Sequence, residues 1–305
     1  VPVKHWLHAF RLRTLTLAVS SIIVGSALAY RFAVLEPTAC GFKWIVLVLS
    51  LLTAILLQIL SNLANDLGDH QHGTDNQDRV GPQRAVQSGA ITPAQMKRAM
   101  IICGLMAFLS GCALITAALG LTLQTLLFLL LGLAAIGAAV KYTFGKNPYG
   151  YAGLGDISVF LFFGILGVCG TFFLHAQTLD KLVVLPSVGI GLLSVGVLNL
   201  NNMRDIENDR SSGKRTIPVR IGAERASIYH SRLIIGGIAA IIASTVENYD
   251  HPVQWIIVPP LGLILAHWYR ETKIRKPQDL DPELKRLAMS TFLTALLFSL
   301  GLILA

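Results

Sequence analysis

Two clusters of carboxylate and carboxamide side chains stand out because each lies where a long apolar run ends. The members are Asn62, Asp66 and Asp69 in the first cluster, and Asn201, Asp205 and Asp209 in the second. Residues three or four positions apart share a face of an α-helix, so each cluster would present one amide and two carboxylates together if its helix continues through the motif. Carboxylates held so close repel one another, and a hard divalent cation such as Mg²⁺ removes that conflict by binding their oxygens.

Basic residues follow each acidic cluster at a similar distance, after a turn that contains glycine. They are Arg79 and Arg84 after the first cluster, and Lys214 and Arg215 after the second. Arg and Lys donate charge-assisted hydrogen bonds to phosphate oxygens, and Mg²⁺ prefers one or two carboxylates together with substrate phosphates. The pattern predicts a diphosphate held between two acidic helix ends. The alternative, that these charges only end a membrane span in water, must explain two such clusters rather than one.

The elements that must position these clusters are membrane helices. The chain has 305 residues, of which 53% are hydrophobic and 14% are charged, and its mean hydropathy is +0.62. Soluble domains carry roughly 25% charged residues, so there is too little charge here to cover a water-facing surface. The apolar residues also come in runs of the length that spans a bilayer. The composition excludes an ordinary soluble enzyme and predicts an all-α, polytopic membrane bundle.

Nine transmembrane helices are expected, and both acidic clusters then lie at the cytoplasmic face. The approximate spans are 15–34, 43–64, 97–119, 121–141, 154–174, 182–202, 226–246, 252–269 and 287–305. With a cytoplasmic N-terminus, this arrangement puts 21 of the 25 Lys and Arg residues in cytoplasmic segments, as the positive-inside rule requires. Contact with anionic lipid accounts for the net charge of +8 without a nucleic-acid partner.

A single domain over residues 1–305 is expected. It comprises two loosely repeated halves, about 15–141 and 154–246, followed by C-terminal helices over 252–305. Two long cytoplasmic loops, 65–96 and 203–225, cap the bundle and carry most of the polar functional groups. Long structured loops in compact proteins are usually functional, so we expect the chemistry at this cap.

The sequence resembles the UbiA superfamily of intramembrane aromatic prenyltransferases. The matching stretches are 65–69 with 73–75, 78–84, 146–156, 201–209 and 213–216. The stretch 148–156 and the Asn-Asn-x-Arg-Asp form of the second motif are most similar to the branch that prenylates 1,4-dihydroxy-2-naphthoate in menaquinone biosynthesis. The resemblance adds Asn65 to the candidate metal ligands and Arg204 to the candidate diphosphate ligands. It also brings in Arg11, and Asp75 as a third acid after the first cluster.

The resemblance implies Mg²⁺-dependent transfer of a polyprenyl chain from its diphosphate to a dihydroxynaphthoate ring, with loss of the ring carboxylate as carbon dioxide, in a bacterial inner membrane. The allylic cation must meet the ring before it meets water, so the cavity must be dry. Tyr142 is a candidate for stabilising that cation with its aromatic face. Asp156 and Lys141 could act as acid and base on the acceptor, or they could simply form a structural salt bridge.

Two alternatives remain at this point. The acceptor could be another aromatic acid such as 4-hydroxybenzoate. A secondary transporter would also have many spans, pseudo-repeats and intramembrane acids, but transporters place their coupling sites near the bilayer midplane. No Asp or Glu lies in the middle of an expected span, which favours an enzyme of diphosphate chemistry.

Overall fold

The computed structural model describes residues 1–38, 41–76 and 80–305, and every regular element within them is a helix. The helices up to the middle of the chain are α1 (Val3–Phe10), α2 (Leu12–Leu35), α3 (Trp44–Gln71), α4 (Pro93–Leu119), α5 (Leu123–Lys141), α6 (Gly155–Val159), η1 (Phe160–Gly170) and α7 (Thr171–Ala176). The remaining helices are η2 (Lys181–Val183), α8 (Val184–Arg204), α9 (Ile206–Ser211), α10 (Ile217–Ile221), α11 (Ala223–Glu247), η3 (Pro252–Ile257), α12 (Val258–Glu271), η4 (Pro277–Asp279) and α13 (Leu280–Leu304).

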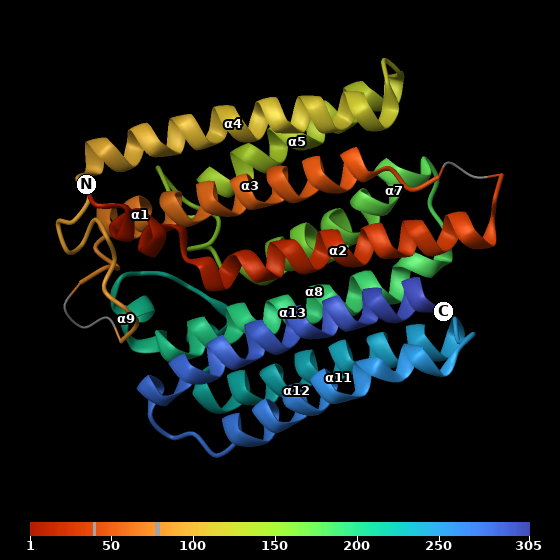
Figure 1. The fold of residues 1–305 in the computed structure, drawn as a ribbon. Coiled ribbons are helices and arrows are strands. Elements are labelled where there is room, and N and C mark those ends of the chain that lie inside the picture. Colours follow the sequence, from red (N-terminus) through yellow and green to blue (C-terminus); the bar gives the residue numbers. More distant parts are fainter. Residues whose placement is uncertain (39–40, 77–79) are drawn as a thin grey trace.

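The predicted all-helical membrane bundle is confirmed, with one difference in the number of spans. In the described part of the chain, eight helices are long and apolar enough to cross a membrane. The eighth expected span, 252–269, is divided into the six-residue 3₁₀ helix η3 and the 14-residue helix α12, which together run beside α13 (Figure 1). Pro259 and Pro260 lie in the first turn of α12, where their missing N–H groups are tolerated, and this explains why the helix starts afresh there.

Helices α2 and α8 form the centre of the bundle. Their most apolar windows are 67% and 72% buried, whereas the window of α5 is only 6% buried, so α5 lies at the edge. The main hydrophobic core joins α2, α8, α11, α12 and α13. A second core joins α3 to α4 and to the loop that connects them.

The segment α6–η1–α7 is one continuous helix whose middle part, Phe160–Gly170, is wound as a π-helix. Two of its glycines allow close contact with the central helices. A Cβ at Gly164 would lie 2.7 Å from the Ser187 carbonyl oxygen on α8, and a Cβ at Gly167 would lie 2.5 Å from Cβ of Ser21 on α2. These glycines therefore let the wide π-helix pack directly on α2 and α8.

Both acidic clusters lie at the same end of the bundle, where α3 and α8 end and α4 and α13 begin. The short helices α1 and α9 lie at this end as well, together with the loops that follow α3 and α9 (Figure 1). We call it the cap end. The fold thus brings together two motifs that are about 140 residues apart in the sequence.

Candidate active site

A cavity of about 760 Å³ begins at the cap end and runs between the helices. Its polar lining includes Asn62, Asn65, Asp66, Asp69, Arg84, Asn201 and Lys214. Its apolar lining includes Leu17, Leu57, Val159, Phe162, Phe163, Val197 and Leu198, from α2, α3, the α6–η1 helix and α8. One cavity therefore joins an ionic region to a hydrocarbon-like region.

The first cluster lies on one continuous helix, as expected, because α3 extends to Gln71. The two carboxylate oxygens of Asp66 accept hydrogen bonds from the backbone N–H groups of Ala85 and Val86, both at 3.1 Å. Asp69 accepts a hydrogen bond of 2.9 Å from the Tyr151 hydroxyl. Asp66 therefore fixes the loop between α3 and α4 against the end of α3, and Asp69 also contacts the loop after α5.

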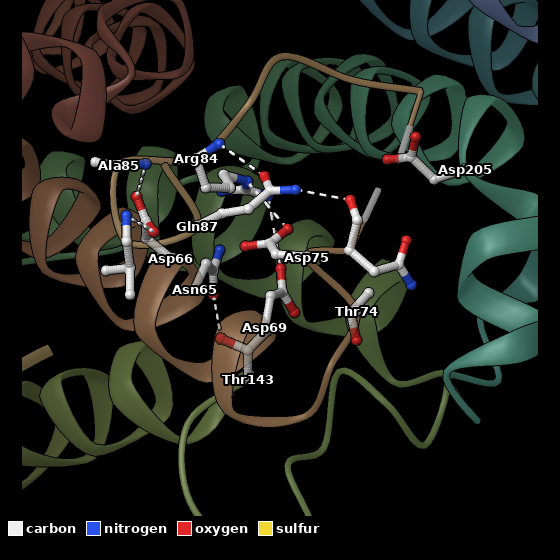
Figure 2. Close-up of polar contacts among 12 residues, drawn as sticks. Asn65, Asp66, Asp69, Thr74, Asp75, Arg84, Ala85, Gln87, Thr143 and Asp205 are labelled. Carbon is white, nitrogen blue, oxygen red and sulfur yellow. Dashed lines mark hydrogen bonds and ion pairs between the residues drawn. The ribbon is translucent and has the colours of Figure 1, made fainter. Parts of the chain in front are cut away.

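The amides of this cluster hold the surrounding helices. Asn65 Oδ1 accepts a hydrogen bond of 2.8 Å from the Thr143 hydroxyl after α5 (Figure 2). Asn62 donates to the Phe10 carbonyl oxygen at 2.8 Å and so connects α3 to the end of α1. Both amides also line the cavity. A carbonyl oxygen has two lone pairs, so Asn65 Oδ1 retains one for a further partner.

Arg84 lies beside the acids of the first motif and has hydrogen-bonding capacity to spare. Its Nη2 is 3.5 Å from Asp69 Oδ2, and its Nε is 3.7 Å from Asp75 Oδ1. Figure 2 shows Asp66, Asp69 and Asp75 grouped near this arginine. The side chain is buried, yet Nε and Nη1 have no hydrogen-bond partner within the described structure. Buried donors without partners cost free energy, and a phosphate in the cavity would satisfy them.

The second cluster departs from the expected single helix. Helix α8 ends at Arg204 and α9 begins at Ile206, so Asp205 lies at a break, with φ −101° and ψ 13°. Arg204 binds the adjacent Asp205 through two hydrogen bonds, from Nε at 2.9 Å and from Nη2 at 2.8 Å. Neighbouring side chains on a regular helix point in different directions, so this two-pronged contact requires the break. The expectation that one helix continues through Asn201, Asp205 and Asp209 is wrong for this reason.

Lys214 lies between the two clusters. Its Nζ is 3.6 Å from Asp209 Oδ1, and it interacts electrostatically with Asp69 of the first cluster. Burial opposes its charge, but Asp209 and Asp69 outweigh burial and raise the pKa of Lys214 above its usual value. Burial raises the pKa of Asp209 to about 6, although Lys214 lowers it. Asp209 Oδ2 is buried without a hydrogen-bond partner in the part of the chain that is described.

The loops that carry the two motifs also contact each other. Asn208 on α9 donates a hydrogen bond of 2.7 Å to the carbonyl oxygen of Thr74, which follows the first cluster. Of the second cluster, Asn201 is among the described residues that line the cavity, whereas Asp205 and Asp209 are not. Each of these two acids is linked to a lining residue, Asp209 through Lys214 and Asp205 through the Arg204 contact with Asn201.

Tyr142 lines the cavity beyond the acids, at the end of α5. Its ring meets that of Tyr149 edge to face, with centroids 5.3 Å apart. Burial raises the pKa of Tyr142, so its hydroxyl stays neutral.

Other predicted site residues lie away from the cavity. Lys141 is exposed and donates to the Lys146 carbonyl oxygen at 2.5 Å, and Asp156 accepts a hydrogen bond of 2.9 Å from Tyr229. The two are therefore not brought together, neither as an acid and base nor as a salt bridge. Arg215 is exposed.

Three further predicted residues have different outcomes. Arg204 is buried and bonded to its own chain instead of facing the cavity. Arg11 lines the cavity and interacts electrostatically with Asp66. Arg79 lies outside the described residues.

Tyr151 is a site residue that sequence reasoning missed. Its hydroxyl contacts Asp69 at 2.9 Å and the Thr74 hydroxyl at 2.5 Å, and Lys214 Nζ lies 5.4 Å from the centre of its ring. It therefore touches both acidic motifs from the loop after α5. The only signal in the sequence was its position within the matching stretch 146–156, since a tyrosine in a loop has no spacing that indicates its partners.

Comparisons with known proteins identify the family and the fold. The model of the UbiA prenyltransferase family matches residues 18–297. A Haemophilus influenzae protein named 1,4-dihydroxy-2-naphthoate octaprenyltransferase is 43% identical, over 99% of this chain and 96% of its own. The Escherichia coli protein of the same name is 42% identical, over 98% and 95%. The structure of a UbiA homolog from Archaeoglobus fulgidus bound to GPP and Mg²⁺ has the same fold, with a TM-score of 0.65 at 15% identity, over 99% of this chain and 100% of that one.

Proposed function

The chain belongs to the UbiA prenyltransferase family, and we propose that it transfers a polyprenyl group from polyprenyl diphosphate to 1,4-dihydroxy-2-naphthoate, in menaquinone biosynthesis. The ring carboxylate leaves as carbon dioxide. The observation that carries the proposal is the cavity itself: at one end lie buried acids and the donors of Arg84 that have no hydrogen-bond partner among the described residues, and an apolar passage follows. This arrangement matches a substrate with an anionic head and a hydrocarbon tail.

The donor set supports Mg²⁺ as the cofactor. Among the described residues, no group of three or more Asp, Glu, His and Cys side chains could enclose a metal unaided. Mg²⁺ commonly takes one or two carboxylates and completes its shell with substrate phosphates and water. Among the described residues, Asp209 Oδ2 has no hydrogen-bond partner although it is buried, so its lone pairs remain for a ligand that reaches it past Lys214.

The proposed metal ligands are Asp66, Asp69, Asp205 and Asp209, with Asn62, Asn65 and Asn201 beside them. When bound, Mg²⁺ supplies Lewis-acid stabilisation of the negative charge that develops on the departing diphosphate.

Residues of the chain itself bind the head group and the prenyl tail and exclude water. Arg84 and Lys214 donate hydrogen bonds to phosphate oxygens and hold the head group at the cap end. The apolar lining from α2, the α6–η1 helix and α8 holds the prenyl tail and excludes water from the allylic cation. Tyr142 presents a neutral aromatic ring to the same space, where its face attracts the cation. Arg215, which is exposed, and Arg79 are retained as proposed diphosphate ligands.

We also propose that the cap end faces the cytoplasm of a bacterial inner membrane. The support is the distribution of Lys and Arg, most of which lie in segments at the cap end.

The test is to incubate the purified protein in detergent with Mg²⁺, a polyprenyl diphosphate and each aromatic acceptor, and to identify products by mass. We expect the decarboxylated prenyl naphthoquinol from dihydroxynaphthoate. Preference for 4-hydroxybenzoate would overturn the acceptor, and absence of any prenylated product would overturn the enzyme. Because detergent leaves no sealed compartment, a product formed there also excludes a transporter as its source.

A further inference from the structure

Arg204 is bound on three sides at the edge of the second cluster. Besides its two bonds to Asp205, its Nη2 donates to Asn201 Oδ1 at 2.9 Å, and its Nη1 donates to Asp281 Oδ1 at 2.5 Å. Its side chain is 1% exposed. The guanidinium is planar and rigid, so fixing its Nη1 edge also fixes the Nη2 edge that holds Asn201 and Asp205.

Asp281 supplies the outer contact from a distant part of the chain. It lies in the first turn of α13, 77 residues after Arg204, and its side chain is 34% exposed. Arg13 Nη1 on α2 lies 3.5 Å from the same carboxylate oxygen. Two arginines and two aspartates therefore form a balanced chain of charges that runs from α2 and α13 to the second cluster.

The pairing of Arg204 with both Asp205 and Asp281 determines how much negative charge Asp205 has available for a cation. If Arg204 paired with Asp205 alone, its positive charge would neutralise that carboxylate. Because Asp281 shares the guanidinium, Asp205 keeps more negative charge for a cation. Mutation of a residue that hydrogen-bonds a metal ligand commonly lowers the metal affinity by about 10-fold to 100-fold.

The loop between α3 and α4 also packs against the guanidinium of Arg204. A Cβ at Gly81 would lie 2.6 Å from Arg204 Nη2 and 2.8 Å from Cζ, so the backbone packs directly on the guanidinium. Arg204 cannot turn away unless this loop moves, and three residues later the same loop carries Arg84.

We propose that Asp281 is a positioning residue for the second acidic cluster: through Arg204 it holds Asn201 and Asp205 in the orientation that metal binding requires. The inference rests on the proposed function in assigning that cluster to a metal. Asp281 contacts both Arg204 and Arg13, and it reaches Asn201 and Asp205 through Arg204.

The experiment is Asp281→Asn, which removes the charge and keeps a hydrogen-bond acceptor. We expect Mn²⁺ binding to the purified protein in detergent, followed by EPR, to weaken about tenfold. The Mg²⁺ concentration for half-maximal rate should rise by a similar factor, while kcat at saturating Mg²⁺ stays within about threefold. The matched control is Asp279→Asn, because Asp279 is exposed, lies two positions away and removes the same charge from the same helix end. It should leave both metal constants unchanged.

A second variant perturbs Arg204 from the opposite side without changing charge. In Gly81→Ala the new Cβ must displace the guanidinium, and we expect metal binding to weaken in this variant too. Gly81→Ala tests the Arg204 contact through which Asp281 acts, and it remains informative if Asp281→Asn does not accumulate in the membrane. Wild-type metal constants in either folded variant would overturn the role of Asp281. A wild-type protein that forms no prenylated product would overturn the proposed function instead, while the EPR titration would still judge Asp281.

Discussion

Replacing Arg84 by Gln tests whether the cavity is built for a diphosphate. Two of its nitrogens, Nε and Nη1, are buried and have no hydrogen-bond partner in the part of the chain that the structure describes. If each donates one charge-assisted bond to phosphate, worth about 1.5 kcal/mol at the lower limit, the variant loses about 3 kcal/mol of binding. Each 1.36 kcal/mol corresponds to about tenfold, so kcat/KM for the polyprenyl diphosphate should fall about 100-fold.

The assay is steady-state prenyl transfer in detergent, with the diphosphate varied at saturating Mg²⁺ and acceptor. The half-saturating Mg²⁺ concentration should not rise, because Asp69 and Asp75 lose their positive neighbour and attract cations more strongly. Arg98→Gln is the matched control, since Arg98 is exposed on α4 near the same end. A folded Arg84→Gln variant whose kcat/KM stays within about threefold of wild type would refute the reasoning.

Three further outcomes are expected. Lys214→Ala should lower kcat/KM by about 100-fold, because a buried cation between Asp209 and Asp69 is lost. The control Lys141→Ala should change kcat/KM less than about threefold, because Lys141 is exposed. Equal effects of the two variants in the same assay would contradict the assignment of Lys214. Tyr151→Phe should lower kcat/KM by about tenfold, since Asp69 loses the hydrogen bond that orients it, and an unchanged rate would leave Tyr151 a purely structural role. Excess EDTA should abolish prenyl transfer, and added Mg²⁺ should restore it; turnover that persists in EDTA would rule out the metal-dependent mechanism.

The sequence allowed the helical bundle and the meeting of the two acidic clusters to be predicted. Long apolar runs set the spans, and the bias of Lys and Arg toward alternate connections placed both motifs at one end. The three-to-four residue spacing also placed Asn62, Asp66 and Asp69 correctly on one helix, because α3 continues through them. These features depend on local pattern and on the membrane, so a single sequence reveals them.

The partners of individual side chains depend on tertiary contacts and could not be predicted in the same way. Asp156 is taken by Tyr229, a residue 73 positions away, and so is not available to Lys141. Arg204 was expected to bind a phosphate, but its guanidinium is bound by the adjacent Asp205 and by the distant Asp281. No spacing rule relates positions so far apart, and both misplacements arise from this.

The cavity with an ionic end and an apolar end has a consequence for the direction of the proposed reaction. Once the chain has been transferred and carbon dioxide has left, the other two products belong to different phases: diphosphate is most stable in water beyond the cap end, and the prenylated ring is most stable among lipid acyl chains. The reverse reaction would require diphosphate to return from water and the prenylated ring to return from lipid to the same cavity. A cavity open to both environments would let each product leave toward the phase that it prefers, which would slow the reverse reaction.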